Sequence, residues 1–272
     1  VAALTEVLAL RREMGDVGYI ATACMRLGIA TMSQGRLANA EPLLREALTR
    51  YRRQGIEWGI AYTLCHLGDL ARQQDSPERA AMLYDEALAI ARQSDNQRAQ
   101  AYIMGQQGEL ARAQGAIERA TALWQASLAI YRALGVPGDA AYALLTLGDL
   151  AREAGHDDEA LAAYCEALRL FHEISAADGV VASLEHIAGL SGAADTPESA
   201  RQAARLFGLC DATRARLGFP LTPVERRQRE VALTRLRATP GEERFALAWE
   251  TGAAMSLEQG IAVVPRLSAS NQ

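Results

Sequence analysis

Four histidines are the residues best suited to bind a metal ion, but their spacing argues against a shared site. They are His66, His156, His172 and His186. The sequence holds no H-E-x-x-H pair, and His172 has no second ligand at the offset that zinc sites use. We therefore predict no metal and no other cofactor.

Nucleophilic catalysis also lacks its usual residues. There is no G-x-S-x-G motif, and the cysteines at 24, 65, 165 and 210 lie far apart without a C-x-x-C pair. The sequence contains no lysine, which excludes a Schiff base and a phosphate-binding loop of the G-x-x-x-x-G-K-[ST] type. We predict that the chain is not an enzyme.

Composition points to a soluble protein with a sizeable core. Of the 272 residues 50% are hydrophobic, and the formal net charge of −5 argues against a general coat for nucleic acid. Separated cysteines are typical of a reducing cytosol, and no apolar stretch approaches the roughly 20 residues that span a bilayer. We expect a cytoplasmic protein without a membrane partner. Because Val1 already lies in a helical pattern, we also expect a piece of a longer polypeptide.

An internal repeat of forty residues must position any site in this chain. A small residue begins each unit's pattern at Gly28, Gly68, Gly108, Gly148 and Ala188, followed twelve residues later by Ala40, Ala80, Ala120, Ala160 and Ala200. Apolar residues recur three or four apart, which predicts two amphipathic helices per unit, and short breaks make neighbouring helices antiparallel. We expect the glycine to meet the alanine where the two helices cross. The aromatic residue four positions after the alanine (Tyr84, Trp124, Tyr164) is expected to fill the gap between adjacent pairs.

This pattern resembles the tetratricopeptide repeat (TPR), in motifs such as Leu67-Gly68 followed by Ala80-x-x-x-Tyr84. Two differences are a pitch of forty rather than thirty-four and the absence of the tyrosine that follows the glycine in TPR units. The resemblance implies an all-α, right-handed TPR-like solenoid of antiparallel helix pairs, closed by C-terminal capping helices. The expected divisions are the second helix of a truncated repeat (1–14), repeats 15–54, 55–94, 95–134 and 135–174, a degenerate repeat 175–218, and a helical cap and tail 219–272.

The C-terminal part extends the resemblance. The segments Ala204–Gly208, Leu217–Pro223, Gly241–Glu250 and Met255–Gln259 are similar to the end of bacterial signal-transducing (STAND-class) ATPases with TPR sensors, including LuxR-type and maltose-activator-like transcriptional regulators. The resemblance implies a sensor and protein-interaction domain of a larger regulator. It also implies a nucleotide-binding motor elsewhere in the parent protein.

One face of the first helix in each unit carries a column of side chains that could bind a ligand. Its members share the forty-residue register: Tyr62, Tyr102 and Tyr142; His66 and Gln106; Asp69, Glu109 and Asp149; Arg72, Arg112 and Arg152. An acid and an arginine three apart on a helix are neighbours and can pair. One interpretation is a solvated, salt-bridged surface. The other is a concave face that binds a peptide, a partner protein or a small, sugar-like effector.

Two further hypotheses concern the ends of the chain. Residues 201–244 carry ten arginines and five acids, and their basic helix presents a contact surface of Arg226, Arg227, Arg229, Arg235 and Arg237. This helix is either a solvated face of the cap or a direct contact to DNA. At the other end, an apolar stripe of Leu4, Val7 and Leu8 is expected to be exposed, and it would support a homo-oligomer.

Overall fold

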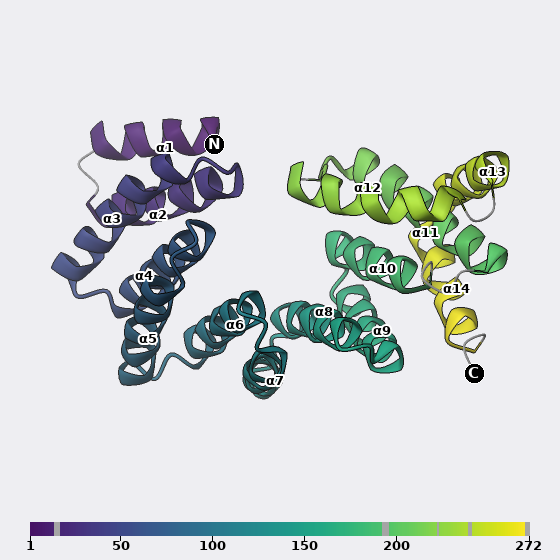
Figure 1. Cartoon of the computed structure of the whole chain (residues 1–272). Coiled ribbons are helices and arrows are strands. Elements are labelled where there is room, and N and C mark those ends of the chain that lie inside the picture. The colour runs from purple at the N-terminus through teal and green to yellow at the C-terminus, as the bar shows by residue number, and fades with distance from the viewer. Residues whose placement is uncertain (14–16, 192–195, 222, 239–240, 270–272) are drawn as a thin grey trace. The chain divides into compact units, whose positions relative to one another are not determined.

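The computed structural model describes residues 1–13, 17–191, 196–221, 223–238 and 241–269. Within these ranges every regular element is a helix and no strand occurs, so the predicted all-α fold is confirmed (Figure 1). The chain divides into two compact units, residues 1–134 and 135–272.

Unit 1 consists of successive helices in which each contacts the next. Its described helices are α1 (Ala2–Glu13), α2 (Val17–Ser33), α3 (Leu37–Gln54), α4 (Glu57–Gln73), α5 (Pro77–Gln93), α6 (Gln97–Ala113) and α7 (Ile117–Ala133). The pairs α2/α3, α4/α5 and α6/α7 pack most closely, and α4 also contacts both α2 and α6. The first helices of consecutive pairs therefore lie side by side.

Unit 2 continues with helix pairs and ends in a cap. Its described helices are α8 (Pro137–Glu153), α9 (Asp157–Glu173), α10 (Ala177–Ser191), α11 (Pro197–Leu217), α12 (Pro223–Ala238), α13 (Glu242–Ala253) and α14 (Leu257–Ala269). Helix α13 packs along α11, while α14 contacts α9, α10 and α11. These contacts cover the last helix pair, as a terminal cap of a repeat array must.

The turns show why the helices end where they do. One residue in each turn has a left-handed backbone: positions 35, 75, 115 and 155 between the two helices of a pair, and positions 55, 95, 135 and 175 between pairs. Glycine occupies five of these positions, at no steric cost, and Asp75, Asp95 and Ser175 occupy the others. A left-handed residue directly after a helix ends it and reverses the chain.

Capping contacts occur at several helix starts: Asn96 Oδ1 accepts a hydrogen bond from the Ala99 amide at α6, and α11 and α14 carry reciprocal pairs. At α11, Thr196 Oγ1 accepts a hydrogen bond from the Ser199 amide at 3.1 Å, and the Ser199 hydroxyl is 3.3 Å from the Thr196 amide. At α14, Ser256 and Gln259 make the equivalent reciprocal pair. Ser76 precedes Pro77 at the start of α5, a sequence typical of a helix start, but its side chain makes no capping hydrogen bond.

Inside the pairs α4/α5, α6/α7 and α8/α9, the glycine column is covered by aromatic rings, whereas Leu44 covers Gly28 in α2/α3. A Cβ added to Gly68 would overlap the ring of Tyr84, and Gly148 has the same relation to Tyr164. Both tyrosines are fully buried.

The expectation that glycine meets alanine is confirmed at Gly28 and Gly108, where an added Cβ would lie 3.5 Å and 3.4 Å from the carbonyl oxygens of Ala40 and Ala120. The expectation that the aromatic ring fills the space between pairs was wrong. The ring packs on the glycine of its own pair, because a residue without a side chain leaves room for a flat ring.

In the cap, two helices approach until their backbones touch. A Cβ on Gly252 of α13 would overlap the backbone carbonyl of Arg205 in α11, and a Cβ on Gly208 of α11 would overlap the carbonyl of Trp249. Backbone atoms cannot rotate away as a side chain can. The position of α13 on α11 thus depends on both glycines.

We expect Gly252→Ala to lower the free energy of unfolding by about 1–3 kcal/mol, the usual cost of overpacking a close-packed contact. Gly189→Ala in α10 is the matched control, since nothing lies within 4 Å of its added Cβ. That change should raise stability by roughly 0.5–1 kcal/mol through helix propensity. Denaturant unfolding measures the change in the free energy of unfolding for each substitution. Equal effects of the two substitutions would contradict the close contact between α11 and α13.

Candidate functional site

In unit 1, the structure brings together three of the predicted site residues. Tyr62 of α4 and Tyr102 of α6 lie with their ring centroids 5.6 Å apart, and the His66 ring lies 5.8 Å from that of Tyr102. All three side chains are half-buried. They form an aromatic cluster, here called the α4/α6 cluster, on the side where the two first helices contact each other.

The acids of the column have a different role from the one their spacing indicates. Asp69 is buried, with 6% of its surface exposed, and accepts a hydrogen bond from the Tyr84 hydroxyl at 2.8 Å. His66 Nδ1 lies 3.2 Å from the other carboxylate oxygen. Burial, together with the charge of Asp69, raises the pKa of Tyr84, so the hydroxyl stays protonated and donates. Asp69 thus joins the two helices of its pair.

The same connection recurs in the next two pairs. Trp124 Nε1 donates to Glu109 at 3.1 Å, and the Tyr164 hydroxyl donates to Asp149 at 2.7 Å. In each case the ring that covers the glycine column also supplies the donor. Sequence reasoning identified both columns but did not pair them, since the partners lie fifteen residues apart on different helices.

The predicted pairs between acid and arginine exist, but they are long. Arg112 lies 3.8 Å from Glu109, and Arg152 lies 3.9 Å from Asp149. Arg72 is half-buried beside Tyr84 and Asp69, with its Nε atom buried and lacking a hydrogen-bond partner. The arginines are therefore secondary partners of acids that aromatic donors already hold.

The remaining members of the column are placed separately. Gln106 is half-buried on α6. Tyr142 belongs to unit 2, where its ring meets that of Phe171 edge-on at 4.9 Å and remains 51% exposed.

His186, which the sequence offered only as a structural histidine, forms a polar contact between two helices of unit 2. Its Nδ1 lies 2.7 Å from the Ala182 carbonyl, which requires a proton on Nδ1, and its Nε2 lies 3.6 Å from Asp149. Burial alone would lower the pKa of His186, but the hydrogen bond and charge of Asp149 outweigh it and raise the pKa. A second proton, on Nε2, would face the carboxylate.

The predicted basic surface of α12 is partly turned inward. Arg229 is 9% exposed and lies 2.7 Å from Asp211 and 3.3 Å from Glu185. Arg237 is held by Glu230 at 3.0 Å. Arg226 is exposed.

The side chains of Arg227 and Arg235 lie outside the described residues. Direct DNA contact through α12 stays a prediction. Of the arginines whose side chains are described, Arg229 is too deeply buried to meet a phosphate backbone.

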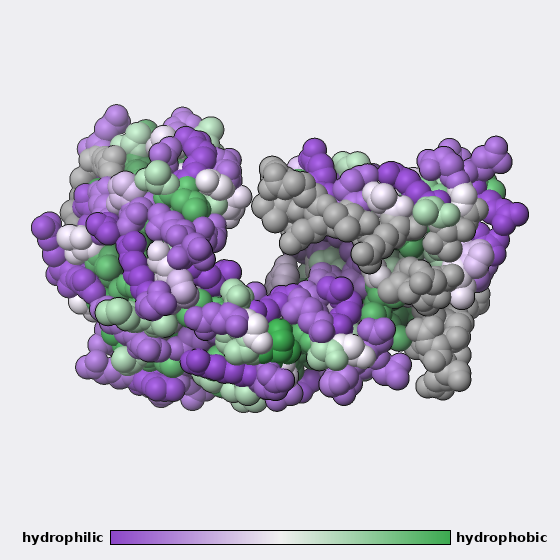
Figure 2. Space-filling model, in the orientation of Figure 1, coloured by the Kyte–Doolittle hydropathy of each residue, from purple (hydrophilic) through white to green (hydrophobic). Residues whose placement is uncertain are grey.

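The N-terminal stripe is less exposed than expected. Leu8 is buried and Leu4 packs against the core beneath α2, whereas Val7 and Leu10 are 43% and 51% exposed. In the view of Figure 2, hydrophilic residues dominate the surface and apolar ones appear in small groups. The expectation that Leu4 and Leu8 are exposed was wrong, because α1 packs on α2 through them. Self-association through α1 stays a prediction that now depends on Val7 and Leu10.

Two further kinds of site, a metal site and a membrane span, depend on the side chains and helices of the described residues. No cluster of three or more histidine, cysteine, aspartate or glutamate side chains there could hold a metal ion. No helix in the same part of the chain is long and apolar enough to cross a membrane.

Comparison with known proteins agrees with the arrangement of the helices. The tetratricopeptide repeat family model matches residues 19–93, which contain the pairs α2/α3 and α4/α5. The chain has a TPR-like fold. No curated protein sequence matches it.

Several solved structures share this TPR-like fold at low identity. BtubC (BKLC) from P. vanneervenii is 18% identical with a TM-score of 0.62, over 81% of this chain and 91% of that one. PilF from Pseudomonas aeruginosa is 18% identical with a TM-score of 0.53, over 85% of this chain and 97% of that one.

A third structure is a STAND protein with a tetratricopeptide repeat sensor from Pyrococcus horikoshii. It is 20% identical with a TM-score of 0.61, over 77% of this chain and 32% of its own. The present chain thus spans about a third of that protein.

The raised pKa of His186 predicts a pH dependence of stability. A group whose pKa is higher in the folded state stabilises fully below its unfolded pKa, about 6.5 for histidine, and less as pH rises through the folded value. We expect the free energy of unfolding to fall as pH rises above about 6.5, and His186→Gln to reduce this slope. His156→Gln, at an exposed histidine, is the control. Urea unfolding between pH 5.5 and 8.5 measures the slopes, and an unchanged slope in His186→Gln would disprove the contact with Asp149.

Proposed function

We propose that this chain is a non-enzymatic TPR scaffold that serves as the sensor and protein-interaction domain of a larger ATPase-type transcriptional or signalling regulator. It binds a peptide, a partner protein or a small effector on the face formed by its first helices. The observation that carries the proposal is the α4/α6 cluster of Tyr62, His66 and Tyr102, at the place where consecutive first helices meet.

The chemistry of this face suits a partner with both apolar and acidic groups. Tyrosine rings offer a large contact area at a low cost in side-chain entropy, together with a polar atom that can bond to a backbone. Arg112 follows Tyr102 on α6, is 25% exposed, and lies at the long distance of 3.8 Å from Glu109. Its guanidinium has five N–H donors and can also donate to a carboxylate of a partner.

The role within a regulator is supported by the TPR sensor of the STAND protein, whose fold the chain shares. ATP handling by a phosphate-binding loop needs a lysine, and this chain has none. On this proposal the motor lies in another part of the parent protein, and an effector shifts the population between resting and active states. The gene provides a direct test. A reading frame without a G-x-x-x-x-G-K-[ST] motif would contradict the ATPase context while leaving the scaffold role intact.

For the partner-binding face, we expect the double substitution Tyr102→Ala/Arg112→Ala to weaken binding by about tenfold or more, because aromatic and arginine side chains dominate interface energetics. Peptides selected on the wild-type chain from a display library supply the ligands. Calorimetry measures their affinities for each variant, and circular dichroism checks that the helices are retained.

The matched control is Met82→Ala/Arg92→Ala, which removes one large apolar side chain and one arginine from α5, a second helix. Met82 is 73% exposed and Arg92 is also exposed. Selected peptides should bind this variant as tightly as the wild type. Equal affinity for the wild type and the Tyr102/Arg112 variant, or an equal loss in the control, would refute the assignment of the face.

A further inference from the structure

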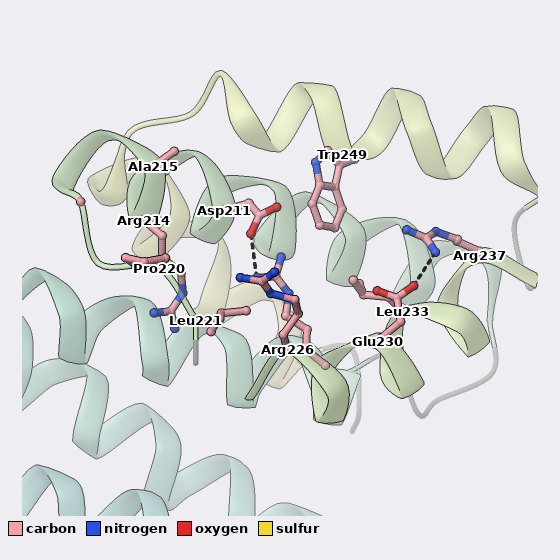
Figure 3. A pocket seen from close by; sticks show the side chains of 12 residues that line it. Asp211, Arg214, Ala215, Pro220, Leu221, Arg226, Glu230, Leu233, Arg237 and Trp249 are labelled. Carbon is pink, nitrogen blue, oxygen red and sulfur yellow. Dashed lines mark hydrogen bonds and ion pairs between the residues drawn. The ribbon is translucent and has the colours of Figure 1, made fainter. Parts of the chain in front are cut away.

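The cap of unit 2 contains a pocket of about 570 Å³ whose walls come from α11, the loop after it, α12 and α13 (Figure 3). Small-molecule sites commonly measure about 300–1,000 Å³. Four arginines line the pocket, together with the acids Asp211 and Glu230 and the half-buried ring of Trp249. It is thus both cationic and partly aromatic.

Arg229 lies at the centre of this arrangement. Its Nη1 atom is shared by Asp211 at 2.7 Å and Glu185 at 3.3 Å, and its guanidinium carbon lies 5.6 Å from the centre of the Trp249 ring. Its Nε atom is buried and has no hydrogen-bond partner. A guanidinium has five N–H donors, and buried donors in proteins are nearly always bonded. The pocket wall therefore contains a donor that the protein itself does not use.

The other arginines leave an excess of positive charge. Arg214 is held by Glu185 at 2.6 Å, and Arg237 is held by Glu230 at 3.0 Å. Arg226 lines the pocket, is exposed, and has no ion pair with any described residue. Among the side chains that the structure describes, four guanidinium groups thus face three carboxylates, and the charge without a described counterpart is that of Arg226.

We propose that this pocket binds a small organic anion: a phosphate or carboxylate group attached to a flat apolar ring. The forked donors of arginine match the paired oxygens of either anion, and the exposed part of the Trp249 ring together with Leu221 can contact the ring. Figure 3 shows Trp249 pointing from α13 toward the arginines. The recessed position of Arg229 favours a small molecule over the phosphate backbone of a nucleic acid.

This site shares no residue with the α4/α6 cluster and does not depend on the function proposed above. An anion could bind the cap whether or not a partner binds the first helices. The proposed anion site and the proposed partner-binding face can therefore be disproved independently of each other.

The test uses calorimetry on the whole chain with phenyl phosphate and benzoate as anionic probes, and with phenol and inorganic phosphate as their separate halves. We expect an anion with a ring to bind more tightly than either half. Arg226→Gln should weaken the affinity for this anion by about tenfold, because one charge-assisted contact is lost. Arg244→Gln removes the same charge from the exposed surface of α13, outside the pocket, and should leave affinity unchanged.

Arg226 is exposed, so its substitution leaves the buried ion pairs intact; thermal unfolding of both variants verifies this. Binding of phenyl phosphate or benzoate that is lost in Arg226→Gln and kept in Arg244→Gln supports the site, and the tighter probe identifies the anion. The proposal is overturned if neither probe binds the wild type at millimolar concentration, or if both variants weaken binding equally. Duplex DNA that binds more tightly than either probe, and does so through Arg226, would also overturn it.

Discussion

Each central helix pair is held together by an aromatic ring that lies across a glycine and donates a hydrogen bond to an acid. Tyr84 covers Gly68 and bonds to Asp69, and Tyr164 covers Gly148 and bonds to Asp149. The two contacts depend on each other. The ring fits only where the facing helix lacks a Cβ, and its buried hydroxyl needs an acceptor because an unsatisfied polar group in a core is costly. The crossing of the two helices is thereby fixed in both position and rotation.

This constraint decides which residues of the first helices remain for a partner. Asp69 and Asp149 are occupied by the tyrosines of their own pairs, so the acids of the column are part of the scaffold. The rings of Tyr62 and Tyr102 meet each other between α4 and α6, the first helices of two consecutive pairs. The interpretations of a salt-bridged surface and of a ligand face thus apply to different residues of the same column. The acids serve packing, and the tyrosines, His66 and Arg112 carry the proposed contact.

The sequence predicted the helices and turns because both depend on residues close together in the chain. Apolar spacing located the amphipathic stripes, and the short breaks between them located the reversals, where Gly35, Gly55 and their equivalents adopt a left-handed backbone. The sequence did not predict the hydrogen bonds between acids and aromatic rings. An acid and an arginine three residues apart can be recognised as neighbours on one helix, whereas Asp69 and Tyr84 lie on different helices and meet only after folding. Contacts between helices that are distant in the sequence also explain why the predicted basic surface of α12 was wrong at Arg229. Its arginines appear exposed in the sequence, but the carboxylates that bury Arg229 come from α10 and α11.

The placement of Glu185 and His186 as neighbours on α10 links two parts of unit 2. Glu185 holds Arg214 and Arg229 at the cap pocket, while His186 contacts Asp149, the acceptor in the α8/α9 pair. An anion that engages Arg229 would share its guanidinium with Glu185 and Asp211 and would weaken their hold on it. Glu185 and His186 are adjacent in the sequence, so α10 contacts both the cap pocket and the α8/α9 pair. A ligand in the cap and a second proton on His186 would each meet a contact made by a side chain of α10, the helix that carries both.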